Sequence, residues 1–334
     1  MESINNYYYN LPTELIAQKP LDKRHESRLL IYNKKEDSIE HRHFFELVDY
    51  LKKGDILVVN ETKVVNTKLI GQKETGGQAS ITLIKKKNNK EYEAFVKCKN
   101  PQIGNKLLFQ DGVIAEIASQ IDFHFLLKFN QPIEKIIKQK GDFTLPGYIH
   151  NENYDRKKYQ TVFALKEGSV AAPTAGLHFS SKLIERLEAK GIEIVKICLH
   201  VGLGTFAEIR EEDYKKHKMH FEWFEIDKKA AEVINKRKGA LYVVGTTSLR
   251  TLESATLKNG KVKACAKETN LFIYPGYKFN LKFDGLITNF HLPRTSLLLL
   301  IASLIGDKWH ELYNEAIEQH YRFYSFGDAM FIRF

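Results

Sequence analysis

Titratable side chains stand at several points of the sequence where an apolar run ends. In residues 288–293 (TNFHLP), Asn289 and His291 lie just before a proline that ends such a run. The ordinary pKa of histidine is about 6.5, so His291 can exchange a proton near neutral pH. The segment predicts either a general acid or base, or a histidine that only makes structural hydrogen bonds.

Residues 245–248 (GTTS) follow the apolar run 241–244 and precede a helical pattern. Hydroxyls and free N–H groups at the start of a helix can hold a phosphate or a carboxylate. Arg250 could pair with such an anion or with Glu253 three positions later. The alternative is that these hydroxyls only cap the helix.

A glycine-rich segment, residues 201–206 (VGLGTF), follows the alternating apolar run 192–201. Its glycines would let a ligand approach the backbone closely. A dinucleotide or methyltransferase loop opens directly into an apolar-periodic helix, whereas residues 207–213 are mostly polar and acidic. We therefore reject a Rossmann-type site and keep a packing turn as the alternative.

Three possible metal ligands, His217, His220 and Glu222, lie close together in the sequence. A His-x-x-His pair without a third ligand at a recognised spacing is not typical of zinc sites. The three cysteines stand too far apart for a CxxC metal pair or a disulfide framework. We therefore expect no metal site, and the cysteine usage fits a reducing compartment.

Regular elements must hold these side chains in place. Apolar runs at residues 55–59, 192–201 and 241–244 predict strands, and Ser181 and Asp227 can cap helices between them. Strands that alternate with helices predict an α/β sheet covered on both faces. Ligand sites in such sheets lie at the carboxyl ends of the strands.

The pattern differs in residues 67–147, where alternating segments are joined by the turn sequences at 88–89 (NN) and 111–112 (DG). Both are favoured hairpin connections. We therefore predict the α/β fold class, with a discontinuous main domain formed by residues 1–66 and 148–334. Residues 67–147 would form an inserted all-β domain.

The overall composition is that of a globular protein with a basic surface. The 334 residues are 43% hydrophobic and 28% charged, which argues against wholesale disorder. The formal charge is +10, an excess that would attract nucleic acid, although a lysine-rich solvated surface gives the same balance. The longest apolar run, residues 297–305, is about half of the ~20 residues that a membrane span needs, so we expect a buried helix there. We see no signal peptide and expect a cytoplasmic protein.

Several strings, taken together and in order, resemble one known family. They are residues 15–20 (LIAQKP), 27–30 (SRLL), 60–64 (NETKV), 159–162 (YQTV), 169–179 (SVAAPTAGLHF), 200–206 (HVGLGTF), 219–220 (MH), 244–248 (VGTTS), 252–254 (LES), 272–276 (FIYPG), 287–293 (ITNFHLP) and 321–330 (YRFYSFGDAM). Over nearly its full length the chain resembles the S-adenosylmethionine:tRNA ribosyltransferase-isomerases of queuosine biosynthesis.

The resemblance implies an unusual use of S-adenosylmethionine. Its ribosyl part, rather than its methyl group, would be transferred to 7-aminomethyl-7-deazaguanine in the anticodon loop of tRNA, giving epoxyqueuosine with release of adenine and methionine. S-Adenosylmethionine would be consumed as a substrate, with no other cofactor. The family's architecture implies a β-barrel for the insert, and we expect a monomer without membrane attachment.

The candidate site residues come from these strings. For acid and base chemistry we select His178, His200, His220, His291 and Asp328. For substrate binding we select Asn60, Thr62, Thr174, Gly202, Gly204, Thr205, Thr246, Thr247, Arg250, Asn289, Tyr321 and Arg322. The ring of Tyr321 would receive the sulfonium by cation–π attraction, and the methionyl carboxylate would lie on residues 245–248 or pair with Arg250.

The sequence departs from the family pattern at two points. After residues 76–77 (GG) a glutamate is expected, but the chain continues as residues 78–81 (QASI). After residues 292–293 (LP) the family has Ser-Thr, whereas this chain has residues 294–296 (RTS). The second departure leaves open which hydroxyl of that loop meets the ligand.

Two other functions fit parts of the sequence. A non-catalytic RNA-binding factor would use the basic surface and the all-β insert, and only substrate turnover separates it from an enzyme. An ordinary methyltransferase would need a glycine loop that opens a helix, which residues 201–213 do not provide.

Overall fold

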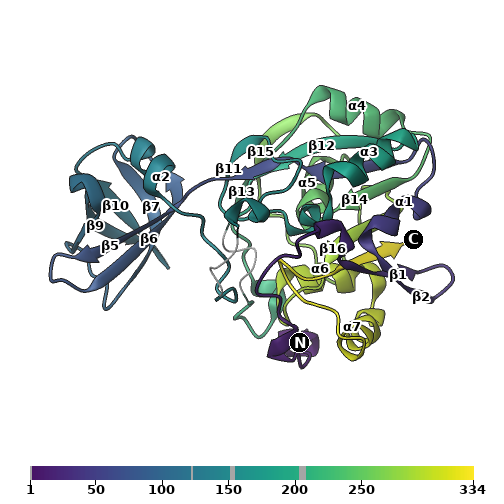
Figure 1. The fold of residues 1–334 in the computed structure, drawn as a ribbon, viewed down its shortest axis with the longest axis horizontal. Coiled ribbons are helices and arrows are strands. Elements are labelled where there is room, and N and C mark those ends of the chain that lie inside the picture. The colour runs from purple at the N-terminus through teal and green to yellow at the C-terminus, as the bar shows by residue number, and fades with distance from the viewer. Residues whose placement is uncertain (1, 122, 151–154, 203–207) are drawn as a thin grey trace. The chain divides into compact units, whose positions relative to one another are not determined.

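The structure, a computed structural model, describes residues 2–121, 123–150, 155–202 and 208–334 (Figure 1). The chain forms two compact units, one of Met1–Lys63 with Pro146–Phe334 and one of Val64–Leu145. Each unit has its own apolar core.

The larger unit is built on a nine-stranded mixed sheet with the order β15-β13-β12-β3-β14-β16-β17-β1-β2. Its strands are β1 (Arg28–Asn33), β2 (Ser38–His43), β3 (Ile56–Asn60), β12 (Glu193–Leu199), β13 (Glu222–Ile226), β14 (Leu241–Val244), β15 (Cys265–Thr269), β16 (Gly285–Asn289) and β17 (Ala329–Arg333). The adjacent strands β12, β3, β14 and β16 are parallel. These strands confirm the α/β class.

Helices cover both faces of the sheet because alternate residues of its strands face opposite sides. Val58 and Val243 pack with α4 (Lys228–Lys236), α5 (Thr246–Ala255), α6 (Ser296–Ile305) and α7 (Lys308–Glu318). Leu57 and Val244 pack with α1 (Leu47–Tyr50) and α3 (Ser181–Ala189) on the other face. As expected, α6 is buried, and none of the helices in the described parts of the chain is long and apolar enough to cross a membrane.

Short elements connect these layers. The 3₁₀ helices of this unit are η1 (Ile4–Tyr7), η2 (Thr13–Leu15), η3 (Arg24–Glu26), η4 (Phe44–Glu46), η6 (Arg156–Tyr159), η7 (Thr174–His178) and η9 (Tyr214–Lys216). Strands β4 (Thr62–Val64) and β11 (Lys166–Ser169) form a separate two-stranded sheet.

The helix caps follow the sequence signals with one correction. The Asp227 carboxylate accepts from Ala230 N at 2.7 Å, as expected for the cap of α4. For α3 the expected cap, Ser181, is wrong by one residue. The hydroxyl of Ser180 accepts from Leu183 N at 3.2 Å, so Ser181 is already the first residue of the helix.

The smaller unit is a closed barrel with the order β10-β7-β6-β5-β8-β9, which confirms the predicted all-β insert. Its elements are β5 (Lys68–Lys73), β6 (Gln78–Lys86), β7 (Glu91–Cys98), β8 (Lys106–Leu108), η5 (Gln110–Gly112), β9 (Ile114–Ile121), β10 (His124–Phe129) and α2 (Glu134–Lys140). The turn at residues 88–89 joins β6 to β7, as its sequence indicates. Closure leaves no open sheet edge.

Candidate active site

The predicted polar segments meet at one edge of the large sheet. Because β12, β3, β14 and β16 are parallel neighbours, their carboxyl ends lie side by side. His200 follows β12, Asn60 ends β3, Gly245 follows β14 and Asn289 ends β16. Segments that are far apart in the sequence therefore bring their functional groups to the same edge.

Strands β17 and β1 contribute the residues at their amino ends to the same edge. Strand β17 runs antiparallel to β16, and Asn289 is opposite Ala329, so Asp328 lies beside the end of β16. Strand β1 is parallel to β17, with Leu29 opposite Ala329. The residue before β1, Ser27, is therefore delivered to the edge as well.

His178 is fixed at the centre of this group. Its Nδ1 atom lies 2.8 Å from Ser27 Oγ, and its Nε2 atom lies 3.1 Å from Asn289 Nδ2. The imidazole ring stacks on Phe44 with a centroid distance of 4.9 Å, and only 4% of the residue is exposed. Both ring nitrogens therefore have partners within the protein.

The environment keeps the His178 imidazole neutral. Burial is the main reason that its pKa falls to about 3, and the positive charges of Arg322 and Arg24 lower the pKa further. At neutral pH the ring is therefore uncharged.

Asn289 determines which nitrogen of His178 carries the proton. Its Nδ2 atom lies 3.0 Å from the carbonyl oxygen of Tyr324, which can only accept a hydrogen bond, so this atom is the amide nitrogen. The same NH2 group faces Nε2 of His178, which must then accept. Nδ1 of His178 consequently carries the proton and donates it to Ser27.

The same amide has an acceptor without a partner among the described residues. Asn289 is 2% exposed, and no described group forms a hydrogen bond with its Oδ1 atom. A buried acceptor without a partner is costly in a folded protein. Such an atom is suited to receive a donor from a substrate.

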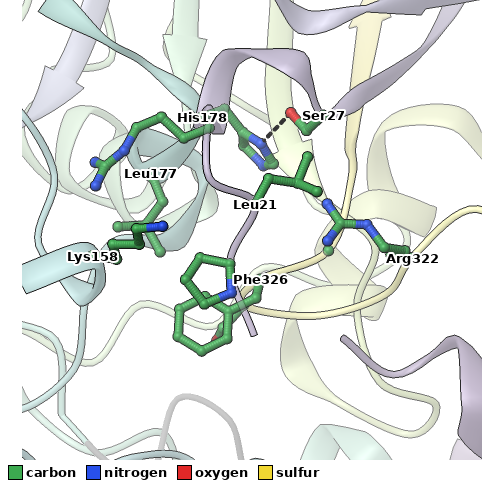
Figure 2. A pocket seen from close by; sticks show the side chains of 11 residues that line it. Leu21, Ser27, Lys158, Leu177, His178, Arg322 and Phe326 are labelled. Carbon is green, nitrogen blue, oxygen red and sulfur yellow. Dashed lines mark hydrogen bonds between the residues drawn. The ribbon is translucent and has the colours of Figure 1, made fainter. Parts of the chain in front are cut away.

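Two pockets flank the His178 and Asn289 pair. The first, shown in Figure 2, is lined by Pro20, Leu21, Arg24, Ser27, Lys158, Leu177, His178, Arg322, Ser325, Phe326 and Gly327. The second is lined by Tyr148, Thr174, Asn289, Phe290, His291, Leu292, Thr295, Leu297, Tyr324 and Ser325. Of the predicted binding residues, Thr174 and Asn289 line the second pocket and Arg322 lines the first.

His291 is also buried and neutral. Its Nε2 atom lies 2.9 Å from Thr288 Oγ1, and its backbone N–H donates to the hydroxyl oxygen of Tyr313 at 3.0 Å. Burial lowers the pKa of His291 to about 3. This histidine is held in place by its own strand end and by α7.

The departure at residues 294–296 has a structural role. Thr295 is the N-cap of α6, and its hydroxyl accepts from Leu298 N at 3.4 Å and donates to the Leu292 carbonyl at 2.8 Å. Arg294 adopts a positive φ of 56°, and its guanidinium lies 4.9 Å from the centre of the Tyr8 ring. The Thr295 hydroxyl is thus occupied by the helix start.

His200 is only partly buried, unlike His178 and His291. Its Nδ1 atom lies 2.8 Å from Thr62 Oγ1, and the ring stacks on Trp223 at a centroid distance of 4.9 Å. Partial burial and the charge of Lys166 lower the pKa of His200. Within the described ranges Nε2 has no hydrogen-bond partner, and it can take up a proton in the tautomer in which Nδ1 donates to Thr62.

Asn60 and the first residues of α5 form buried polar contacts at this edge of the sheet. The Asn60 side chain donates to the Leu199 carbonyl and accepts from Leu199 N and Thr62 N, at 3.0 to 3.1 Å. Thr246 and Thr247 are buried, and Asn60 Nδ2 lies 3.4 Å from Thr247 Oγ1. The Asn60 amide is thus satisfied by the protein and holds β3 against β12.

Arg250 is bound by a carboxylate of the protein itself. It forms a buried ion pair with Glu222, whose other oxygen accepts from Gly202 N at 2.9 Å. Both side chains are 3% exposed. Arg250 also donates from Nε to the Leu271 carbonyl at 3.0 Å, while its Nη2 group has no partner among the described residues. Its predicted role with a substrate carboxylate stays a prediction.

Tyr321 and Asp328 are likewise engaged. The Arg28 guanidinium lies 3.8 Å from the centre of the Tyr321 ring. One face of the ring that we expected to contact the sulfonium is therefore covered by Arg28. The Asp328 carboxylate accepts from the backbone N–H groups of Arg28 and Arg322 and from the Arg322 side chain, at 2.8 to 3.1 Å. Asp328 thus orients the strand ends.

Of the remaining predicted residues, His220 is exposed. Gly204 and Thr205 lie outside the described residues. His200 and Asn289 stand three strands apart, which corresponds to roughly 14 Å at ~4.8 Å per strand. One small group cannot reach both, whereas an extended substrate can.

Four contributors to the site escaped selection from the sequence: Ser27, Glu222, Tyr148 and Tyr324. Ser27 lies in one of the family-like strings, and Glu222 was considered only as a metal ligand. In the described parts of the chain no cluster of three or more His, Cys, Asp or Glu side chains could hold a metal ion. The Glu222 carboxylate serves Arg250 and Gly202 instead.

Two comparisons with known proteins agree with this arrangement. The sequence profile of the family described as queuosine biosynthesis protein matches residues 4–332. The crystal structure of an S-adenosylmethionine tRNA ribosyltransferase from Thermotoga maritima matches with a TM-score of 0.56 and 33% sequence identity. The match covers 98% of this chain and 99% of that one. The chain therefore belongs to the queuosine biosynthesis protein family.

Proposed function

We propose that this protein transfers and isomerises the ribosyl group of S-adenosylmethionine onto 7-aminomethyl-7-deazaguanine in tRNA. The products are epoxyqueuosine in tRNA, adenine and methionine. The observation that carries the proposal is the near full-length match to a tRNA ribosyltransferase at 33% identity. The edge of the sheet supports it, because neutral imidazoles stand there beside two pockets.

The reaction needs at least two titrating groups. The sulfonium makes the protons on the neighbouring ribose carbon acidic, and a base removes one of them. Adenine leaves readily only when an acid protonates it, and the aminomethyl group must lose a proton to become a nucleophile. His200 fits the role of base, because it is neutral and its Nε2 atom has no partner among the described residues.

Asn289 fits the role of a binding residue. Asn289 lines the second pocket together with aromatic, hydroxyl and leucine side chains, and its Oδ1 atom has no partner among the described residues. An amino group of the substrate, such as the exocyclic amine of adenine, is a suitable donor to this atom. S-Adenosylmethionine is consumed in this scheme, and no other cofactor takes part.

The macromolecular partner in this proposal is tRNA that carries the modified base in its anticodon loop. A base must leave its stack to reach a pocket, which is easiest in a single-stranded loop. The formal charge of +10 favours a polyanion. We further propose that the protein acts as a monomer in the cytoplasm.

The direct test incubates the protein with S-adenosylmethionine and tRNA that contains 7-aminomethyl-7-deazaguanine. Mass spectrometry of the nucleosides should show epoxyqueuosine, and free adenine should appear in equal amount. An unchanged base with tRNA still bound would overturn the enzymatic function and favour the RNA-binding alternative. Transfer of a methyl group would instead identify a methyltransferase.

A further inference from the structure

The first pocket of the sheet edge combines apolar side chains with three cations and several hydrogen-bond donors. Arg24, Lys158 and Arg322 line it together with Ser27 and His178, and no Asp or Glu side chain is among its described lining residues. In Figure 2, Lys158 and Arg322 lie on opposite sides of the pocket. We call this the cationic pocket.

Arg24 carries a positive charge in the wall of this pocket. It is half-buried, and its guanidinium donates to the Gln160 carbonyl at 2.9 Å. No carboxylate within the described ranges forms an ion pair with it, and burial lowers the Arg24 pKa. A partly desolvated cation without a counterion is unfavourable, and a bound anion would stabilise it.

The other two cations have partners that leave them able to bind an anion. Lys158 pairs at 2.7 Å with Asp22, whose side chain is fully exposed and therefore a weak partner. Arg322 contacts Asp328 at 3.1 Å, but that carboxylate also accepts two backbone N–H groups. The cationic pocket thus retains a net positive charge.

Ser27 supplies a further donor. Nδ1 of His178 donates to the Ser27 hydroxyl oxygen, because Nε2 must accept from Asn289. The hydroxyl proton of Ser27 is then left for another acceptor, and the side chain lines the cationic pocket. A carboxylate or phosphate oxygen is the acceptor that this set of donors fits.

We propose that the cationic pocket binds an oxyanion of the substrates, which is either the methionyl carboxylate of S-adenosylmethionine or a phosphate of the tRNA. The inference rests on the proposed function and adds the place where one anionic group of the substrates binds. Arg250, which we selected from the sequence for the carboxylate, already has its charge neutralised by Glu222, whereas the cationic pocket keeps a net charge. A bound anion would also offset the field of Arg24 and Arg322 at His178 and so raise the His178 pKa.

The test compares binding by the wild-type protein with binding by Arg24→Gln, Lys158→Gln and Lys157→Gln. Lys157 is the matched control, because it lies beside Lys158 in η6 but does not line the pocket. Calorimetry measures the affinities for S-adenosylmethionine and for its decarboxylated analogue. A second series measures tRNA affinity as a function of salt. Arg24→Lys tests whether a positive charge alone restores binding.

Each source of the oxyanion gives a distinct result. If the carboxylate binds here, the wild-type protein prefers S-adenosylmethionine over the decarboxylated analogue by roughly 10- to 100-fold, and Arg24→Gln abolishes the preference. If a tRNA phosphate binds here, Arg24→Gln lowers the salt slope by about one and leaves the preference unchanged. In both cases Lys157→Gln behaves as the wild type.

Two failures are distinguishable. If the wild-type protein turns over both substrates while folded Arg24→Gln and Lys158→Gln bind them as tightly as Lys157→Gln does, the cationic pocket is not an oxyanion site. If the wild-type protein neither binds S-adenosylmethionine nor converts the tRNA base, the proposed function itself is wrong. Circular dichroism of each variant establishes that it is folded.

Discussion

The Nε2 atom of His178 lies 3.1 Å from the side-chain nitrogen of Asn289, although the two residues are separated by 111 positions. Asn289 thereby fixes the imidazole tautomer and turns the proton of His178 toward Ser27. This contact joins the wall of one pocket to the wall of the other. The predictions below begin with this pair.

Replacing Asn289 by aspartate should raise the pKa of His178. A carboxylate beside Nε2 favours the protonated ring, which the native amide does not. The wild-type pKa of about 3 should therefore increase by at least one unit, and turnover should fall. Two-dimensional NMR of the imidazole nitrogens during a pH titration measures the change. Asn235→Asp on α4 is the control, and an unchanged His178 titration in Asn289→Asp would contradict the geometry described here.

The two buried histidines should make the protein sensitive to acid. In the unfolded chain histidine binds a proton below its ordinary pKa of about 6.5, whereas His178 and His291 remain neutral in the folded protein down to about pH 3. The unfolded state therefore binds more protons in this window. The free energy of unfolding should fall by about 1.4 kcal/mol per histidine for each pH unit below 6.5.

Urea unfolding at pH 7, 6 and 5 measures this loss through tryptophan fluorescence. Both tryptophans, Trp223 and Trp309, lie in the α/β unit and report on it alone. In His178→Gln and in His291→Gln the free energy of unfolding should depend less on pH than in the wild type. This holds whatever the stability of each variant at pH 7. If both variants keep the wild-type dependence, other groups cause the acid sensitivity.

Removing the Glu222 carboxylate should destabilise the α/β unit. Glu222→Gln leaves the Arg250 guanidinium buried without its anion, which costs about 3–5 kcal/mol. The double variant Glu222→Leu with Arg250→Met should recover most of this stability, because no charge stays buried. Glu232→Gln is the control, since its ion pair with Lys236 is exposed. Chemical denaturation measures all four proteins, and equal stabilities for Glu222→Gln and Glu232→Gln would disprove the argument.

His200 should be the histidine whose loss most affects the chemical step. If His200 is the base, His200→Asn should lower kcat by roughly 10²- to 10⁴-fold with little change in KM. His310→Asn, an exposed substitution on α7, is the control. Release of adenine gives the rates. A loss of tRNA affinity at unchanged kcat would assign His200 to binding instead.

Gly168 offers a way to disturb His200 without removing a functional group. Gly168 has a φ of 147°, and a Cβ atom built on it would lie 2.6 Å from His200 Nε2. Gly168→Ala must therefore displace the ring from its present position. Turnover should fall while the fold of the barrel is retained. Wild-type activity in this variant would mean that the position of His200 is unimportant.

The main features of the fold could be predicted because they depend on local patterns. The apolar run 241–244 became β14, and the GTTS segment at residues 245–248 became the start of α5. The partner of His178 could not be predicted in this way. Ser27 is 151 positions away, and only the pairing of β1 with β17 brings it to the site.

Charge partners were equally hidden from the sequence. Glu222 stands next to two histidines in the sequence, yet its partner in space is Arg250 on α5. The ring of Tyr321 was expected to meet a substrate cation, but Arg28 lies over it. Which ion pairs form depends on the order of strands in the sheet, and a single sequence does not specify that order.

The antiparallel entry of β17 has a consequence for protein synthesis. The residues just before this strand supply Ser325, Arg322 and Asp328 to the sheet edge. They are made after every other part of the site, so a nascent chain holds its histidines before Arg322, Ser325 and Asp328 are present. Until β17 has emerged, a nascent chain therefore has no complete binding site with which to capture tRNA. The active site can close only after β17 has left the exit tunnel and paired with β16 and β1.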